Sequence, residues 1–191
     1  MDKTPPTLLL RIRNPDDAVA WTEFYAIYGP LVYRYAQVRG LSHADAEDVR
    51  SQCLHVVVET IGEFEYDRAK GGFKNWLRRI ASNKIVDAHR KRREKRAESQ
   101  DLREIVDDRL GPDELWDRHW HHEHLNYCVD QVRESVSPEN YEAFRLLVFE
   151  ERPVKEVCDR LGMNANQVYL AKSRVLDRVR KKMLELGTDE F

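Results

Sequence analysis

Glycines, aromatic residues and cations gather in one stretch of the sequence, AKGGFKNWLRRIASNK at 69–84, and the basic tract HRKRREKR follows at 89–96. Bases of single-stranded DNA stack on aromatic and guanidinium planes, while cationic side chains follow the phosphates. At about 100° per residue, one helix face carries an aromatic ring, an amide and two guanidiniums within roughly 60°. These residues are Trp76, Arg79, Asn83 and Arg90. The stretch therefore predicts a surface for single-stranded DNA, led by the aromatic loop GEFEYDRAKGG at 62–72.

Two of the aromatic residues in this stretch have a plainer interpretation, because aromatic side chains contribute strongly to hydrophobic cores. We expect Phe73 to belong to the core. For Trp76, stacking on a base and packing in the core both remain open.

A second group of residues has the types that bind metals. It consists of His119, His121, His122, His124 and Cys128. His124 and Cys128 are four residues apart and therefore share a helix face, but a tetrahedral site needs further ligands, and no distant Cys/His pair supplies them. We expect polar-face histidines beside a buried cysteine, with no metal and no cofactor. Cys53 and Cys158 are equally isolated in the sequence, so all three cysteines are predicted to be small buried residues rather than disulfide partners.

Charge is unevenly distributed along a chain whose formal net charge is only -2. Ten Lys/Arg against two acids give +8 over 74–96, eight acids against three arginines give -5 over 97–118, and 172–182 carries +5. Two basic segments separated by an acidic one indicate two nucleic-acid contacts joined by a linker. The alternative is that each charged run is a solvated helix face.

Long apolar segments are missing from the sequence. No run of about 18 apolar residues occurs, and the N-terminal apolar stretch is too short for a signal peptide. We therefore expect a cytoplasmic protein with no membrane contact.

Apolar residues recur at three- and four-residue spacing, which predicts an all-α fold of two small helical domains joined by a linker. An aromatic-rich helix or helix pair is expected at 16–38, broken at Gly29-Pro30. Ser42 is a good N-cap and Gly62 a natural stop, so a helix is predicted between them. One face of that helix is polar. It carries Asp45, Asp48, Gln52, His55 and Glu59.

The strongest local pattern lies near the C-terminus, in PVKEVCDRLGMNANQVYLAKSRVLDRVRKKM at 153–183. It follows a helix that Ser137-Pro138 opens as N-cap and first residue. A short helix, a turn at Gly162, and a longer helix capped by Asn164 have the spacing of a helix-turn-helix. The second helix would then place polar side chains toward the major groove and its phosphates. Its candidates are Asn164, Asn166, Gln167, Tyr169, Leu170, Lys172, Ser173, Arg174 and Arg178.

These segments together carry a family resemblance. DAEDV at 45–49, the aromatic loop running into KGGFKNWLRRIASNKIVDAHRKRR, the acidic linker and the helix-turn-helix resemble an extracytoplasmic-function (ECF) sigma factor of the sigma-70 family. The resemblance implies an N-terminal extension at 1–14, sigma region 2 at 15–96, a linker at 97–111, sigma region 4 at 112–187 and a tail at 188–191.

Residue roles follow from the resemblance. Asp45, Asp48 and Gln52 correspond to the face that docks on the clamp helices of the polymerase beta-prime subunit. The residues expected to capture and hold the minus-ten DNA are Phe64, Tyr66, Lys70, Lys74, Trp76, Arg79, Asn83, Lys84 and Arg90. The helix-turn-helix candidates, Leu170 aside, correspond to contacts with the minus-thirty-five element. After DAEDV the family commonly has a hydrophobic residue, Gln and Glu, whereas this chain has Arg50-Ser51-Gln52-Cys53 and so lacks the acid.

The resemblance implies a sigma factor that binds core RNA polymerase and promoter DNA and promotes melting, without enzymatic activity. Its expected polymerase contacts are the beta-prime clamp helices and the beta flap, and an anti-sigma factor is a further partner that the family allows. One alternative is a stand-alone helix-turn-helix regulator, although the sequence shows neither a coiled coil nor a sensor region. Another is a metal-dependent nuclease built on the histidines, which lacks the carboxylate constellation for that chemistry.

Overall fold

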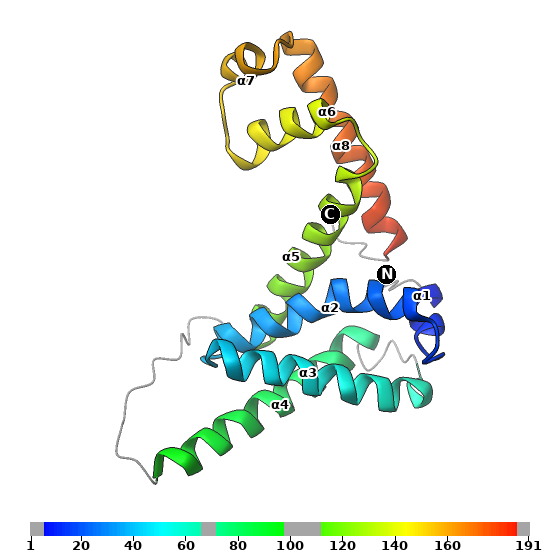
Figure 1. Cartoon of the computed structure of the whole chain (residues 1–191), viewed down its shortest axis with the longest axis vertical. Coiled ribbons are helices and arrows are strands. Elements are labelled where there is room, and N and C mark those ends of the chain that lie inside the picture. Colours follow the sequence, from blue (N-terminus) through cyan, green and yellow to red (C-terminus); the bar gives the residue numbers. More distant parts are fainter. Residues whose placement is uncertain (1–5, 66–71, 98–111, 187–191) are drawn as a thin grey trace. The chain divides into compact units, whose positions relative to one another are not determined.

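The computed structural model describes residues 6–65, 72–97 and 112–186 (Figure 1). These residues form helices and connecting turns, and they include no β-strand. The all-α class predicted from the sequence is therefore confirmed. The chain divides into two compact units, residues 2–123 and 124–191.

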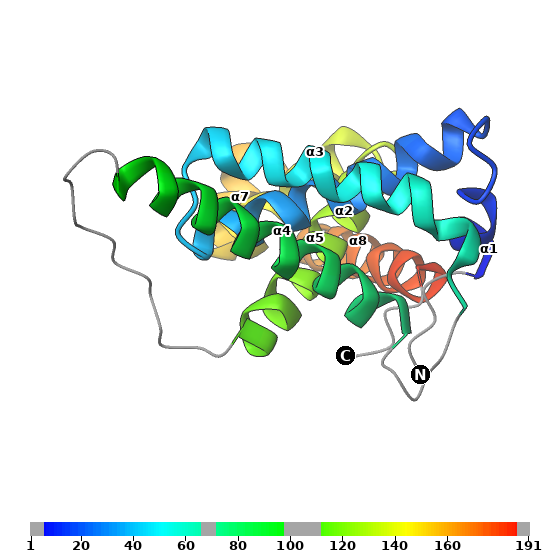
Figure 2. The same cartoon turned by 90° about the horizontal axis from the view of Figure 1, so that it is seen from below.

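The first unit is a bundle of helices. Its elements are α1 (Pro6–Arg11), α2 (Ala18–Val38), α3 (His43–Thr60), the 3-10 turn η1 (Ile61–Glu63), α4 (Gly72–Ala97) and the first half of α5 (Pro112–Arg133). Helices α2 and α3 lie side by side, and α4 runs along α3 (Figures 1 and 2).

Helix α2 is continuous through Pro30, so the predicted break at Gly29-Pro30 is wrong. Proline removes one backbone donor from a helix and favours a kink there. The helix nevertheless continues because buried aromatic side chains on both sides of it, Tyr28 before and Tyr35 after, anchor it to the core. Tertiary packing here outweighs the local preference.

Helix α3 begins and ends close to the predicted residues. The Ser42 side chain accepts a hydrogen bond from the Asp45 amide at 3.2 Å, so the predicted N-cap is confirmed. Gly62 lies within η1, the turn that ends the helix. The apolar face of α3 is buried in the bundle. Its fully buried residues are Ala46, Val49, Cys53 and Val57.

Aromatic rings form the centre of the first unit. Phe73 at the start of α4 is buried, with its ring centroid 5.2 Å from that of Tyr28 and 6.0 Å from that of Phe24. The expectation that Phe73 is a core residue is thus confirmed. Two tryptophans of α5 complete this cluster, with Trp116 5.0 Å from Tyr35 and Trp120 5.4 Å from Tyr28.

The division between the two units falls inside α5, between residues 123 and 124. The sequence interpretation instead began the second domain at 112. The first turns of α5 belong with α2 and α4 because Trp116 is completely buried there and Trp120 is 5% exposed.

The second unit contains the rest of α5 and the remaining helices. These are α6 (Pro138–Phe144), the π-helical turn η3 (Arg145–Phe149), α7 (Val154–Leu161) and α8 (Ala165–Glu185). Ser137 caps α6, as predicted, by accepting from the Asn140 amide at 3.4 Å. A small core joins α6, η3, α7 and α8. It consists of Ala143, Leu146, Val157, Val168 and Ala171.

The cysteines are free thiols in the two units. Burial raises the pKa of Cys53 and of Cys128 to about 12, so neither is a reactive thiolate at neutral pH. Cys158 is half-buried rather than buried, and it packs on the edge of the small core between α7 and α8.

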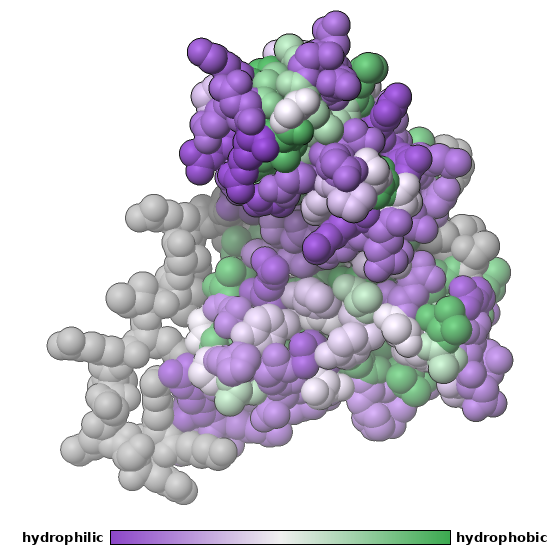
Figure 3. All heavy atoms as spheres, turned by 45° about the horizontal axis from the view of Figure 1, so that its top comes forward, coloured by the Kyte–Doolittle hydropathy of each residue, from purple (hydrophilic) through white to green (hydrophobic). Residues whose placement is uncertain are grey.

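Hydrophilic side chains surround scattered apolar patches on the face shown in Figure 3. Exposed large apolar residues occur in both units, with Val86 on α4 and Leu170 on α8 among them. No helix in the described part of the chain has an apolar segment long enough to cross a bilayer.

Candidate functional site

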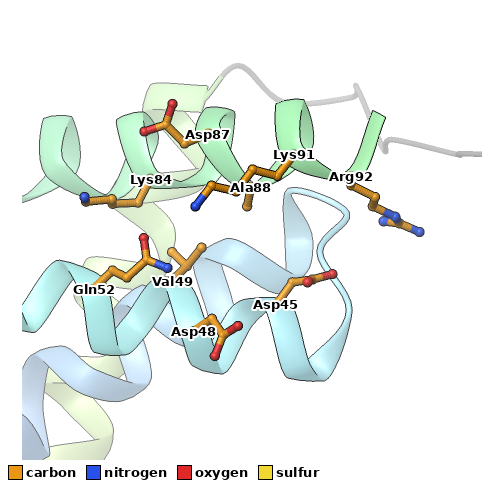
Figure 4. Close-up of a pocket in the computed structure, with 9 residues that line it drawn as sticks. All are labelled: Asp45, Asp48, Val49, Gln52, Lys84, Asp87, Ala88, Lys91 and Arg92. Atoms are coloured by element: carbon orange, nitrogen blue, oxygen red, sulfur yellow. The ribbon is translucent and has the colours of Figure 1, made fainter. Parts of the chain in front are cut away.

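A polar pocket of about 270 Å³ lies between α3 and α4 (Figure 4). Helix α3 contributes the predicted polymerase-binding residues Asp45, Asp48 and Gln52. Helix α4 contributes mostly cations from the opposite side. Its lining residues are Lys84, Asp87, Ala88, Lys91 and Arg92. A partner segment with both a cation and an anion would match the two walls of this pocket.

The C-terminal part of α4 is held against the turn that precedes α3. His89 donates through Nε2 to the carbonyl oxygen of Arg39 at 2.9 Å, and the Arg92 guanidinium donates to the carbonyl oxygen of Gly40 at 3.3 Å. Gly40 has φ 86°, a left-handed conformation that glycine adopts without strain. These contacts fix the separation of the two pocket walls.

Two further residues bear on this pocket. Lys84, which the family resemblance assigns to the DNA-holding residues, lines the pocket beside Gln52, and its role stays a prediction. Cys53 stands where the family commonly has an acid, and it is fully buried and does not line the pocket. Position 53 therefore contributes no side chain to the polar wall of α3.

Trp76 packs within the aromatic cluster while remaining half-exposed. Its ring centroid lies 4.9 Å from that of Phe64 and 5.5 Å from that of Phe73. The two interpretations left open for Trp76 are thus compatible, because one part of the ring contacts the core while another reaches solvent. Tyr66 and Lys70, which the sequence assigned to the same surface, lie outside the described residues.

The stripe beyond Trp76 is exposed on α4. Arg79, Asn83 and Arg90 all point to solvent, with the apolar Val86 62% exposed between them. Arg90 pairs weakly within its own helix, 3.3 Å from Asp87. Exposed pairs of this kind contribute little and are readily exchanged for a phosphate.

Arg13 makes a long-range contact that the sequence interpretation missed. Its guanidinium donates to the carbonyl oxygen of Phe64 at 2.5 Å, where the chain enters the predicted base-capturing loop. Since 51 residues separate the two partners, no local pattern could indicate this bond.

Lys74, a predicted DNA-binding residue, is engaged within the first unit. Its Nζ lies 3.0 Å from a carboxylate oxygen of Asp117 and 5.9 Å from the ring centroid of Trp120. One helical turn further along, Arg78 forms an ion pair with Asp113. A sequence signal for this contact exists, because Asp113, Trp116, Asp117 and Trp120 recur at three- and four-residue spacing on one side of α5.

The helix-turn-helix in the second unit has the predicted turn and caps. Gly162 ends α7 with φ 65°, and the Met163 amide donates to the carbonyl oxygen of Cys158 at 3.2 Å. Asn164 and Gln167 form a capping box, each side chain accepting from the other residue's amide at 2.9 and 2.8 Å. The side-chain oxygens of Asn164 and Gln167 therefore stabilise the start of α8. Their side-chain NH2 groups take no part in this capping box.

The outer face of α8 presents most of its predicted DNA-binding residues. Asn166, Tyr169, Ser173 and Arg174 are exposed. Lys172 is half-buried on the flank nearer the core. Arg178 donates to the carbonyl oxygen of Ser135, which directs its side chain toward the α5–α6 turn rather than outward.

The histidines of α5 differ in environment. His124 is 1% exposed, whereas burial lowers the pKa of the half-buried His119, with smaller contributions from His122, Arg118 and Arg34. Within the described residues, no three His, Cys, Asp or Glu side chains are arranged to hold a metal ion.

Comparison with known proteins bears on the first unit. Residues 24–95 match the family model described as Sigma-70 region 2. The chain is similar to the sigma-70 family over these residues. The matched residues run from Phe24 in α2 to Lys95 in α4, so the polar pocket and the exposed stripe both lie in the segment that matches sigma-70 region 2. The ECF resemblance inferred from the sequence is confirmed, and sigma factors are not enzymes.

A curated relative and a solved structure are similar over most of the chain. The ECF RNA polymerase sigma factor SigE of Mycolicibacterium smegmatis is 24% identical over 151 residues, which cover 78% of this chain. The match spans 56% of the length of that relative. The structure of CnrH in complex with the cytosolic domain of CnrY matches with a TM-score of 0.39 and 18% identity, over 96% of this chain and 97% of that one.

Proposed function

We propose that this chain is an ECF-type sigma subunit that binds bacterial core RNA polymerase, recognises a promoter through two DNA contacts, and favours strand opening. The observation that carries the proposal is the match to sigma-70 region 2 over the residues that form the pocket and the stripe. The helix-turn-helix of the second unit supports it independently, since this motif places its second helix in the major groove.

Three surfaces take separate roles in the proposal. The pocket between α3 and α4 docks on the polymerase clamp helices through Asp45, Asp48 and Gln52. The stripe of α4 holds the unpaired minus-ten strand, and α8 reads the minus-thirty-five element. Trapping an unstacked base offsets the few kcal/mol that unstacking costs.

An anti-sigma factor is a further partner in the proposal. The matched structure of CnrH was solved with the cytosolic domain of CnrY. By family, a protein of that kind would cover the polymerase- and DNA-binding surfaces of this chain.

The test is reconstitution of the full chain with bacterial core polymerase and genomic DNA, followed by mapping of transcript starts. We expect defined starts that depend on the chain. A chain that neither binds core polymerase nor directs any start refutes the proposal. A chain that binds DNA without polymerase and directs no start is instead a stand-alone regulator.

Paired variants separate the pocket from the stripe. Asp48→Asn should weaken core binding, whereas Glu47→Gln, one residue away and paired with Arg50, should not.

Arg79→Ala with Asn83→Ala should leave core binding intact and reduce open-complex formation, measured by permanganate reactivity of the melted strand. Loss of core binding in the latter variant would contradict the assignment of the stripe to DNA.

A further inference from the structure

The first turns of α5 cover part of α4 in the first unit. Trp116 and Trp120 anchor these turns to the aromatic cluster, where Trp120 lies 6.3 Å from Phe73 at the start of α4. Burial of two tryptophans stabilises this contact, since each removes a large apolar surface from water. This part of α5 is therefore a stable neighbour of α4.

The acidic side of the same turns faces two cations of α4. Asp117 pairs with Lys74 at 3.0 Å, and Asp113 pairs with Arg78. The two cations are four residues apart in α4, and the two acids are four residues apart in α5. The later acid pairs with the earlier cation, so the two helices run antiparallel at this contact. The side chains of Lys74 and Arg78 are only 18% and 22% exposed as a result.

These two cations lie in the basic segment that the proposed function gives to DNA. Each cation that neutralises a phosphate releases a counterion, which adds about 0.7 to the salt slope of log K for a single strand. A cation that is already paired with a carboxylate releases fewer counterions when it binds DNA, because the carboxylate must first be displaced. The partners Asp113 and Asp117 thus stand in the place of two phosphates.

We propose that Asp113 and Asp117 compete with the DNA backbone for Arg78 and Lys74, and so weaken DNA binding by the chain on its own. The inference rests on the proposed function only in taking α4 as a DNA-facing helix. The competition is graded rather than complete, because ion pairs whose carboxylates are exposed to water are weak. Trp116 and Trp120 keep the two acids in position each time a phosphate displaces them.

The experiment measures binding of the full chain to labelled oligothymidylate over about 50 to 200 mM salt. Asp117→Asn should tighten binding and steepen the slope of log K against log salt by about 0.7, and Asp113→Asn should act similarly. Both carboxylates are more than half exposed, at 55% and 76%, so the substitutions leave the fold unchanged.

Glu114→Gln is the matched control. It removes the same charge from the same turn of α5, and Glu114 has no ion pair with any residue in the described ranges. A general effect of net charge would change both variants alike, whereas competition for Lys74 changes only Asp117→Asn. Adding Lys74→Gln to Asp117→Asn should abolish the gain, because the released cation is then missing.

The inference is overturned if Asp117→Asn matches Glu114→Gln in affinity and slope, or if the gain persists without Lys74. Absence of measurable binding by Asp117→Asn at low salt overturns it as well. Transcript mapping with the wild-type chain tests the proposed function separately, so the two failures are distinguishable.

Discussion

At the scale of single residues, backbone conformation places the start of α8. Gly162 has φ 65°, and a side chain at a left-handed position costs about 1 to 2 kcal/mol. Gly62, by comparison, has no atom within 4 Å of an added Cβ and no positive φ. An alanine would therefore be strained at Gly162 and unstrained at Gly62.

Gly162→Ala should lower the free energy of unfolding of the second unit by about 1 to 2 kcal/mol, because alanine must adopt the left-handed conformation. Gly62→Ala should change stability by less than about 0.5 kcal/mol. Calorimetry of the full chain measures both variants. Equal shifts for the two would contradict a conformational role of Gly162.

His119 makes the stability of the first unit depend on pH. Burial lowers its pKa below the ordinary value of 6.5, so the unfolded chain binds this proton more readily than the folded chain. The stabilisation from neutral His119 is thus fully present above about pH 6.5 and decreases as the pH falls through that value.

His119→Gln should therefore reduce the loss of Tm of the first unit between about pH 7.5 and 5.5. Comparison with the wild type cancels the titration of all other groups. If the difference in Tm between the wild type and His119→Gln were the same at every pH, the pKa of His119 would be the same in the folded and unfolded chain.

At the scale of elements, α5 belongs to two units at once. Its first turns are part of the first unit, and its last turns belong to the second unit. The indole nitrogen of Trp116 is buried without a hydrogen-bond partner in the described structure, which lowers the stabilisation that this ring provides.

Trp116→Ala should lower the stability of the first unit by about 3 to 5 kcal/mol, the usual cost of removing a buried aromatic side chain. Trp116→Phe should cost less, because it keeps an aromatic ring, although a smaller one, and removes the unpaired N–H. Calorimetric transitions of the two units report which one loses stability. A loss confined to the second unit would contradict the docking of α5 on α2 and α4.

The sequence predicted the elements whose signals are local. Ser42, Ser137 and Asn164 each cap the helix expected of them, and Gly162 ends α7 as its turn position required. These features depend on hydrogen bonds between residues that are a few positions apart, which a sequence shows directly.

Long-range contacts explain what the sequence could not predict. Pro30 stays inside α2 because of aromatic packing from other helices, and Arg178 donates to the carbonyl oxygen of Ser135, which is 43 residues distant. Lys84 is an intermediate case, since its four-residue spacing from Ala88 places both on the side of α4 that faces α3. The roles assigned to the site residues stay predictions, because only their positions are seen.

At the scale of the whole molecule, the uneven charge divides a nearly neutral chain into basic segments, to which the proposed function assigns two DNA contacts. A strongly cationic chain binds any DNA through counterion release. Here the acidic segment at 97–118 offsets much of the formal charge of the basic segment at 74–96. The two proposed contacts lie in different units and should contribute independently.

Arg79 on α4 and Arg174 on α8 test this independence. On a promoter with both elements, Arg174→Ala should weaken the polymerase complex by about 1 to 3 kcal/mol if it contacts a base, or lower the salt slope by about 1 if it contacts a phosphate. On a template that keeps only the premelted minus-ten element, the same variant should bind like the wild type, whereas Arg79→Ala should still lose affinity.

Additivity in the double variant completes the test. Because residues in separate units share no partners, the free-energy losses of Arg79→Ala and Arg174→Ala on the full promoter should add within about 0.5 kcal/mol. Arg180→Ala is the control for charge on α8, since it removes one cation that already lies 3.5 Å from Asp177. An effect of Arg174→Ala on the minus-ten template, or an equal effect of Arg180→Ala, would contradict a direct contact between α8 and the upstream element. Independent, additive losses would instead require two DNA-binding units, because a single contiguous site would couple the two arginines through the same strand.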